Sequence, residues 1–367
     1  MASVARGRGT SFDWVNGVKV YYVGLKNVYW PWPYADTKSR LLKPLWHAFD
    51  TYHPWMAREV ARILELEHPD LVHTNNLTGF SALTWRTIKQ KGLPLVHTLR
   101  DYNLLCPRTT MFREEENCET LCTECRLYAL PRKRLSNLVD VAVGISRFSL
   151  ERHLLFGYFA GTPEKRVIYN AYEVGPDSPP LPPLGTRSLP IRFGYMGRLT
   201  HAKGIEVLLK SITQLPERTW SLDIAGEGPA RFVHYLRTKY KKPAIEFLGH
   251  TRSESFFTNI DVLVASSLWH EPFGRIIIEA YAYGVPVIGA IRGGIPELIE
   301  EERTGFLFDP RQERDLIAKM QRFIDQPGTI NVMQPCCLKK ANNFTPENIT
   351  KQYLEAYAAV TPSLKTT

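Results

Sequence analysis

The chain has 367 residues, of which 44% are hydrophobic and 23% are charged. This composition excludes a disordered protein, and the length favours two globular domains of ordinary size. The formal net charge of +9 favours an anionic partner, without distinguishing among a nucleic acid, an anionic membrane surface and a phosphorylated ligand.

The first half contains short runs of β-branched and aromatic residues that predict strands at 18–24, 70–75, 93–99, 139–146 and 166–170. Aromatic residues are also dense between Phe12 and Trp55, with lysine and arginine residues among them. This density leaves three interpretations open: a stacking platform for sugars, attachment to an anionic membrane surface, or ordinary core packing.

Four cysteines follow within a short stretch, with the spacing C-x11-C-x3-C-x2-C. Four thiolates this close together can enclose Zn²⁺ tetrahedrally, and such a closed site leaves no open position for catalysis. We therefore predict a structural zinc ion in an insertion at 106–125, with reduced thiols as the alternative. The predicted ligands are Cys106, Cys118, Cys122 and Cys125.

The second half begins after a proline-rich linker at 173–190 and alternates strand and helix patterns. Such alternation indicates a parallel sheet covered by helices on both faces, in which ligands bind beyond the carboxyl ends of the strands. The predicted strands span 191–197, 221–228, 244–250, 261–267, 285–290 and 304–309. The residues expected at the ligand-binding edge include Gly197, Glu227, Gly249 and His250.

A predicted helix start at Gly274 and Arg275 suits a phosphate. A glycine there lets backbone N–H groups approach a ligand closely, and those groups carry the positive end of the helix dipole. Arg198 and Lys203, which follow the strand at 191–197, could complete a diphosphate site with a planar fork and a point charge.

Two glutamates flank this helix start. Glu279, inside the helix, could accept hydrogen bonds from both hydroxyls of a ribose, and Glu271, ahead of the helix, would lie nearer a second sugar. A diphosphate flanked by two sugars describes a nucleotide-sugar.

The second half resembles the donor half of the retaining glycosyltransferases of family four, which have the GT-B fold. The resemblance rests on GRLTHAKGIEVLL (197–209), IAGEGP (224–229), IEFLGH (245–250) and the stretch 266–310, which contains the E-x7-E pair of that family. It implies two Rossmann-like α/β domains whose parallel sheets face each other across a cleft. The implied division is an acceptor-side domain at 1–172, a linker at 173–190, a donor domain at 191–345 and a C-terminal helix at 346–367 that packs back on the first domain.

The resemblance implies roles for individual residues. Arg198 and Lys203 would bind the diphosphate, Glu279 the ribose and Glu271 the transferred sugar. Gly249 and His250 would flank the base, while the backbone of Phe273, Gly274 and Arg275 would lie against the sugar and phosphates. With no Asp-x-Asp motif at a strand end, we expect no catalytic metal.

The first half departs from the family pattern in two places. Asp101 falls at the family's acidic position, but Arg100 stands where a histidine is commoner, so the residue that contacts the reacting sugar is His97, Arg100 or neither of them. The chain also begins at what resembles a later part of the first domain, so we expect that domain to lack the opening strand, turn and helix.

The expected activity is transfer of a sugar from a nucleotide-sugar to a glycan or lipid-linked acceptor in cell-surface polysaccharide synthesis. No apolar run approaches the roughly 18 residues of a membrane span, and the start of the chain lacks the apolar core of a signal peptide. We therefore expect a cytoplasmic protein, with peripheral attachment to an anionic membrane as an option. The alternatives are a catalytically impaired nucleotide-sugar-binding protein and, more remotely, a zinc-containing nucleic-acid binder, which lacks a recognition motif.

Overall fold

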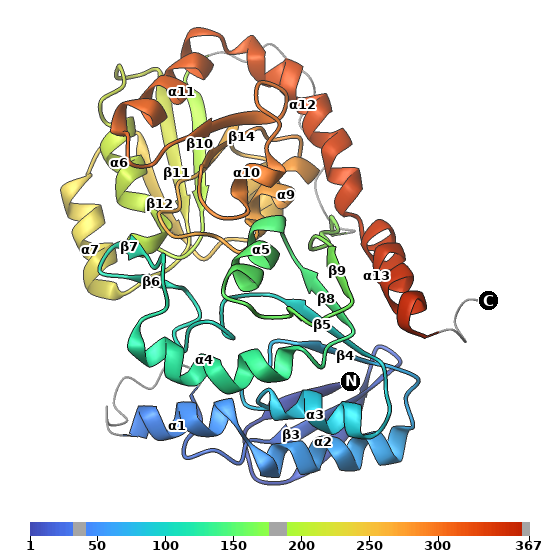
Figure 1. Ribbon diagram of the computed structural model, residues 1–367. Helices are drawn as coiled ribbons and strands as arrows, with labels where there is room; N and C mark the ends of the chain where they lie inside the picture. Colours follow the sequence, from blue (N-terminus) through green and yellow to red (C-terminus); the bar gives the residue numbers. More distant parts are fainter. Residues whose placement is uncertain (32–41, 176–188, 362–367) are drawn as a thin grey trace.

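Two α/β domains lie against each other in the computed structural model, which describes residues 1–31, 42–175 and 189–361 (Figure 1). Most of the predicted linker, and the aromatic residues Trp32 and Tyr34, lie outside the described residues. Within the described ranges, no helix combines the length and the hydropathy needed to cross a bilayer.

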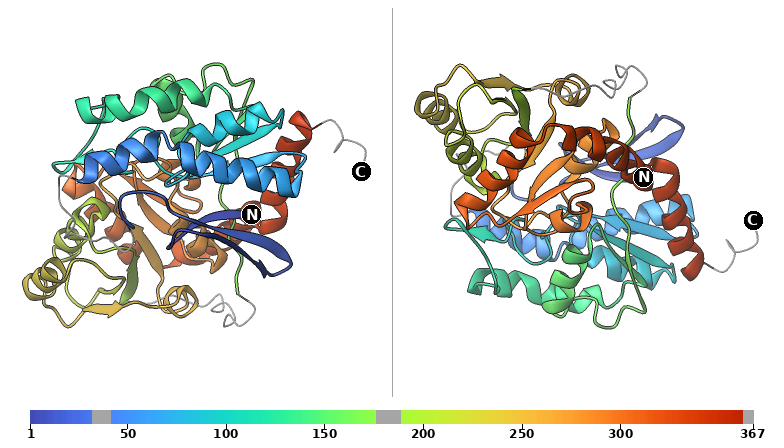
Figure 2. Two further views of the ribbon diagram at one scale, coloured as in Figure 1. Left: turned by 90° about the horizontal axis from the view of Figure 1, so that it is seen from below. Right: turned by 90° about the horizontal axis from the view of Figure 1, so that it is seen from above.

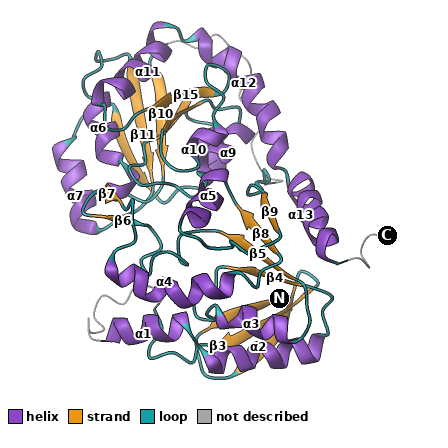
Figure 3. Cartoon of the chain, in the orientation of Figure 1, coloured by secondary structure: helices purple, strands orange, loops and turns teal. Residues whose placement is uncertain are grey.

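The second domain is built on one parallel sheet (Figure 3). Within residues 189–361 its strand order is β12-β11-β10-β13-β14-β15. Chain connections leave in opposite directions at the boundary between β10 and β13, and this reversal opens a crevice at the carboxyl ends of those two strands. The strands are β10 (Ile191–Met196), β11 (Trp220–Ala225), β12 (Ile245–Gly249), β13 (Val262–Ala265), β14 (Val287–Ala290) and β15 (Gly305–Phe308), each inside or within one residue of its predicted run.

Helices cover both faces of this sheet. One apolar cluster joins Phe193 and Phe306 to α6, α7 and α11, and another joins Leu263 to α8, α9 and α10. The sheet is therefore buried on both sides, as its apolar strands require. The helices are α6 (Ile205–Ile212), α7 (Ala230–Lys239), α8 (Ser253–Phe257), α9 (Arg275–Ala282), α10 (Ile295–Leu298), α11 (Glu313–Asp325) and α12 (Gly328–Ala341), with short 3₁₀ turns η1 (His201–Lys203) and η2 (Asn342–Phe344).

The first domain contains a second parallel sheet, of order β4-β5-β8-β9 within residues 42–175. Its core buries Trp85, Tyr158 and Phe159 completely. The strands are β4 (Val72–Asn75), β5 (Leu95–Leu99), β8 (Val141–Gly144) and β9 (Glu164–Val167). The helices are α1 (Leu42–Thr51), α2 (Pro54–Glu67), α3 (Leu83–Gln90), α4 (Thr123–Ser136) and α5 (Arg147–Leu155).

A small separate sheet of β1 (Ala2–Ala5), β2 (Thr10–Val15) and β3 (Val18–Gly24) lies beside α2 in Figure 2. Only β3 was predicted from the sequence. β1 pairs with β3 in parallel, and β2 pairs with β3 as a hairpin closed by Asn16 and Gly17. Both turn residues have positive φ, which is the geometry that an Asn-Gly pair favours in a two-residue hairpin.

The last helix, α13 (Pro346–Val360), runs from the second domain onto the sheet of the first (Figure 1). Ile349 and Ala356 are buried against Val96 and Val141 of that sheet. The Tyr357 hydroxyl lies 2.7 Å from Nδ1 of His73, a residue of β4. The helix therefore ties the two domains together, and it begins beside the linker residues Glu173 and Val174.

A buried histidine is expected to make the first domain sensitive to acid. His153 is fully buried, and burial lowers its pKa to about 4. Its Nδ1 lies 2.8 Å from the Ser149 carbonyl, while Nε2 has no hydrogen-bond partner among the described residues. A proton added at Nε2 would therefore be a buried, unpaired charge.

We expect the free energy of unfolding to fall as the pH drops from about 6.5 to 4. In this range the unfolded chain binds a proton at His153 while the folded chain does not, so the loss from this residue approaches about 3 kcal/mol near pH 4. Urea unfolding at pH 7.5, 6 and 5 measures the decline. A His153→Phe variant should show a shallower decline, and an unchanged slope in that variant would contradict the assignment.

Candidate active site

The predicted ligand-binding residues gather where the strand order of the second domain reverses. The loop after β10 carries Arg198 and Lys203, and the loop after β13 carries Glu271 just before α9. These two strands are neighbours in the sheet, and their carboxyl ends therefore bring both loops to the crevice.

Lys203 and Glu271 form an ion pair across this crevice. The Lys203 Nζ lies 2.5 Å from Glu271 Oε1, and the Ser267 hydroxyl donates to the same oxygen at 2.6 Å. Glu271 is only 9% exposed, so its carboxylate is removed from most of the solvent. The Lys203 ammonium also lies 5.1 Å from the centre of the Trp269 ring. The pair thus places one cation and one carboxylate side by side at the mouth of the crevice.

Two glycines allow the backbone packing behind this pair. Gly204 has φ +67°, and a Cβ at that position would lie 1.8 Å from the Ser266 carbonyl oxygen. Gly293 has φ +59°, and a Cβ there would lie 2.1 Å from the Glu271 carbonyl oxygen. Both the positive φ and the close approach exclude a side chain. The backbone next to Lys203 therefore contacts the backbone of Ser266, and the backbone of Gly293 contacts that of Glu271.

Glu279 lies one turn into α9, close to the helix start at Gly274, where φ is +103°. The Ser253 hydroxyl donates to its Oε2 at 2.9 Å, and the Arg275 Nε lies 2.9 Å from Oε1. Burial raises the pKa of Glu279. Phe273 is buried against Tyr169, so only its backbone can face a ligand.

The loops after β10, β11 and β12 are joined by backbone hydrogen bonds. Leu199 N–H donates to the Glu227 carbonyl at 2.8 Å, and Gly226 N–H donates to the Gly249 carbonyl at 2.7 Å. These bonds place Gly197, Glu227 and Gly249 along one edge of the domain. The side chains expected to face a ligand there, Arg198, Glu227 and His250, are exposed.

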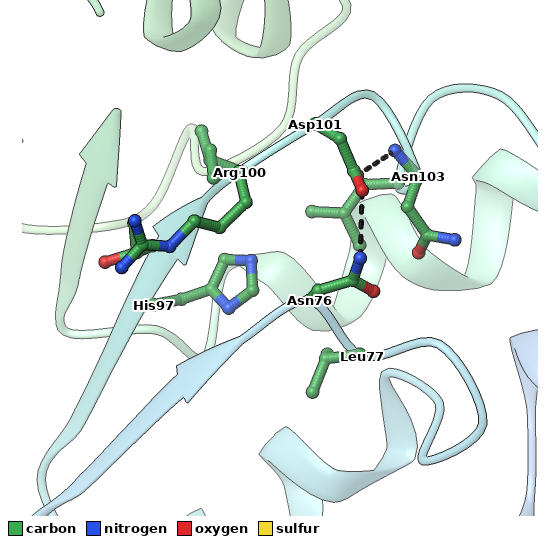
Figure 4. Close-up of a pocket in the computed structure, with 9 residues that line it drawn as sticks. Asn76, Leu77, His97, Arg100, Asp101 and Asn103 are labelled. Carbon is green, nitrogen blue, oxygen red and sulfur yellow. Dashed lines mark hydrogen bonds between the residues drawn. The ribbon is translucent and has the colours of Figure 1, made fainter. Parts of the chain in front are cut away.

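Asp101 and Arg100 lie at the carboxyl end of β5, beside a small pocket of about 10 Å³ (Figure 4). Asp101 accepts hydrogen bonds from Asn76 Nδ2 at 2.9 Å and from the Asn103 N–H at 2.7 Å, and burial raises its pKa. The Arg100 guanidinium donates to the side-chain oxygens of Asn75 and Asn170. Both side chains are thus held at the end of the strand.

His97 also lines this pocket, but it is packed into the core. It is 2% exposed, and its ring packs against both Trp85 and Phe159. The Thr74 hydroxyl lies 2.9 Å from its Nδ1, and burial lowers its pKa well below the usual value. Arg100 is therefore more exposed than His97 and more accessible to a sugar.

The four cysteines of the insertion do not form a closed metal site in the described part of the chain, where no set of three or more His, Cys, Asp or Glu residues is arranged to hold a metal ion. The Cys125 thiol contacts Cys106 and Cys122, and its hydrogen bond lowers the pKa of Cys106. Zinc binding at these cysteines therefore stays an untested prediction, with reduced thiols as its alternative.

Two serines at the site carried no sequence signal. Ser267 and Ser253 hold the two glutamate carboxylates, yet serines in loops and short helices are common. Glu297, in α10, accepts hydrogen bonds at 2.7 Å from both the Arg147 and the Phe148 N–H groups at the start of α5. The second domain thus caps a helix of the first, a contact between distant parts of the sequence.

Known proteins are similar to this chain in sequence. The family model described as glycosyl transferases group 1 matches residues 183–344. An uncharacterized 42.6 kDa protein in the cps region of Klebsiella pneumoniae is 32% identical over 342 residues, which cover 93% of this chain and 86% of that protein. The D-inositol 3-phosphate glycosyltransferase of Rhodococcus jostii is 28% identical over 183 residues, which cover 46% of this chain and 40% of that protein.

Solved structures share the fold. Anabaena HepE in complex with UDP superposes with a TM-score of 0.67 at 20% identity, over 83% of this chain and 82% of that one. Sucrose-phosphate synthase from Thermosynechococcus elongatus gives a TM-score of 0.71 at 18% identity, over 99% of this chain and 89% of that one. The two Rossmann-like domains with parallel sheets therefore have the GT-B arrangement.

Proposed function

This chain belongs to the group 1 glycosyl transferases, and on that premise we propose that it is a retaining glycosyltransferase that uses a nucleotide-sugar donor. The acceptor is proposed to be a glycan or a lipid-linked sugar. The observation that carries this proposal is the pairing of Lys203 with Glu271 just ahead of α9, the helix that carries Glu279 in its second turn.

The proposed roles follow from the charges at this site. A departing nucleoside diphosphate gains negative charge, which Lys203, Arg198 and the N–H groups at the start of α9 would stabilise. The largely buried carboxylate of Glu279 accepts hydrogen bonds and suits the two hydroxyls of a ribose. Glu271 would hold the transferred sugar beside the diphosphate.

The acceptor is proposed to enter from the first domain. The Tyr102 hydroxyl donates to the His270 carbonyl at 2.8 Å, so the chain next to Asp101 touches the chain next to Glu271. Asp101 and Arg100 would therefore face the reacting sugar from the side opposite the donor. Gly249 and His250 would flank the base.

The biological setting is also a proposal. The Klebsiella pneumoniae relative is described as lying in the cps region, and this supports a role in cell-surface polysaccharide synthesis. Phe12 and Trp14 are 57% and 62% exposed on β2, and together with the net charge of +9 they support peripheral attachment to an anionic membrane at its cytoplasmic face.

Thermal-shift measurements with UDP-, GDP- and ADP-sugars test the proposal. We expect one base class to raise Tm by about 5 °C or more at a hundred times its Kd, and a Glu279→Ala variant to lose a large part of that shift. Transfer assays with that donor should yield a product that retains the anomeric configuration, as read by NMR. Stabilisation without turnover would favour a catalytically impaired nucleotide-sugar-binding protein. No shift in Tm with any donor would contradict both that alternative and the proposed transferase.

A further inference from the structure

The backbone of the segment 268–272, which contains Glu271, is held by side chains of the first domain. Three alternate carbonyls of this segment accept hydrogen bonds: Leu268 from Asn117 Nδ2 at 2.8 Å, His270 from Tyr102 at 2.8 Å and Pro272 from Ser146 at 2.6 Å. The donors come from three separate parts of the first domain. Contact with that domain therefore restrains the chain on both sides of Glu271, in addition to the hydrogen bond that Arg292 of the second domain donates to the Leu268 carbonyl at 3.1 Å.

Asn117 makes a second contact that the other two side chains do not make. Its Oδ1 accepts the His270 N–H at 2.7 Å, while its Nδ2 donates to the Leu268 carbonyl. The carboxamide thus replaces one backbone unit of a neighbouring strand, with one donor and one acceptor aligned along the segment. An aspartate would lose the donor, and an alanine would lose both groups.

The position of Asn117 is itself fixed by the cysteine-rich insertion. It ends β7 (Glu116–Asn117), which pairs with β6 (Phe112–Arg113) in a two-residue hairpin. The next residue, Cys118, donates its N–H to the Met111 carbonyl at 2.7 Å and accepts a hydrogen bond from Arg152 of α5. In Figure 1 this hairpin extends from the first domain to the lower edge of the second.

The opposite side of Glu271 is held by the second domain. Lys203 and Ser267 contact its carboxylate, and the Gly294 N–H donates to its carbonyl at 2.8 Å. The carboxylate is thus held by the donor domain alone, whereas the backbone that carries it is held by both domains, because the Leu268 and Trp269 N–H groups also donate to the Ala202 carbonyl of the donor domain. Both sets of contacts exist together only when the two domains are docked.

We propose that Asn117 is a positioning residue that couples docking of the two domains to the placement of the Glu271 carboxylate. This inference rests on the proposed glycosyl transfer, because it assigns Glu271 to the transferred sugar. It gives the insertion a role in the reaction that does not depend on a bound metal. The nucleoside diphosphate, held by the second domain alone, should bind independently of Asn117.

The test compares Asn117→Ala and Asn117→Asp with a matched control, Asn137→Asp. Asn137 is an exposed residue of the same domain whose Oδ1 accepts the Gly161 N–H, and an aspartate keeps that acceptor while adding the same charge. We expect both Asn117 variants to lower kcat about tenfold to a hundredfold, because small displacements of a reacting group are costly. The Kd of the matching nucleoside diphosphate should change less than about twofold, and the control should match the wild type in both measurements.

Hydrogen–deuterium exchange of the backbone amides in 266–274 supplies a readout that needs no turnover. Exchange should rise in both Asn117 variants and stay unchanged in Asn137→Asp. Unchanged exchange, or faster exchange with unchanged kcat, would overturn the inference. Should the wild-type protein turn over no nucleotide-sugar, the proposed function fails, and the exchange data alone decide whether Asn117 holds the segment.

Discussion

Replacing Lys203 by alanine is expected to lower kcat about 100-fold or more for the nucleotide-sugar that the protein uses. The ammonium group is the cation that the structure places next to Glu271, and loss of one preorganised charge at a departing anion costs about this much. Steady-state kinetics with the matching donor measures the effect. Lys242→Ala is the matched control, because that lysine pairs with Glu217 on the surface, and its activity should equal that of the wild type.

A second variant separates two roles of Lys203. If Lys203 acts on the diphosphate and Glu271 on the sugar, then Glu271→Gln should lower kcat by itself, and the Lys203→Ala, Glu271→Gln double variant should lose about the product of the two factors. If each residue serves only to hold the other, the double variant should be no worse than the poorer single variant. That second outcome would contradict the proposed contact between Lys203 and the diphosphate.

Lys203→Ala should also reduce stability, since it leaves the largely buried Glu271 carboxylate with Ser267 as its remaining side-chain donor among the described residues. Activity must therefore be measured at a temperature at which the variant is folded. The matching nucleoside diphosphate should bind the variant more weakly than the wild type. A Kd that does not change would limit the role of Lys203 to the sugar.

The second domain could be predicted from the sequence because its strands are short, apolar and separated by clear helix patterns. Glycines at the strand ends then located the ligand-binding edge, and the Glu271–Glu279 spacing located the carboxylates on either side of a helix start. These signals are local, since each lies within a window of about ten residues. Burial of the sheet on both faces follows from the same apolar runs.

Contacts between distant parts of the chain could not be predicted in this way. Asn117 and Glu297 join the two domains through backbone groups, and backbone groups leave no pattern in the sequence. The β6–β7 hairpin turns at Glu114 and Glu115, both with positive φ, where glycine or asparagine would have given a turn signal. His97 is a buried core residue because it follows the apolar pattern of β5, which outweighs its ring chemistry.

The second large effect is expected from a buried ion pair in the first domain. Asp50 and Arg132 are each 2% exposed, and Asp50 Oδ2 lies 2.8 Å from the Arg132 guanidinium. The Gly79 N–H donates to Asp50 at 2.6 Å, and Arg132 donates to the Asn103 carbonyl at 2.6 Å. This network joins α1 to α4 and fixes the loop that carries Asp101.

Asp50→Ala should lower the free energy of unfolding by about 3–5 kcal/mol, because it leaves the Arg132 charge buried without its partner. Urea unfolding at pH 7.5 measures this loss, which is a large fraction of the about 5–15 kcal/mol typical of a domain. The Glu217→Ala control removes an exposed pair with Lys242 and should change stability by less than about 1 kcal/mol.

An Asp50→Ala, Arg132→Met double variant distinguishes a buried charge from a lost contact. Removing both charges should restore part of the stability, since an apolar pair of similar volume often replaces a buried ion pair at little cost. Recovery should be incomplete, because the Gly79 N–H and the Asn103 carbonyl still lose their partners. If the double variant is less stable than Asp50→Ala alone, the unpaired Arg132 charge does not cause the loss of stability in Asp50→Ala. The hydrogen bond from Arg132 to the Asp101 loop would then contribute more to stability than the ion pair does.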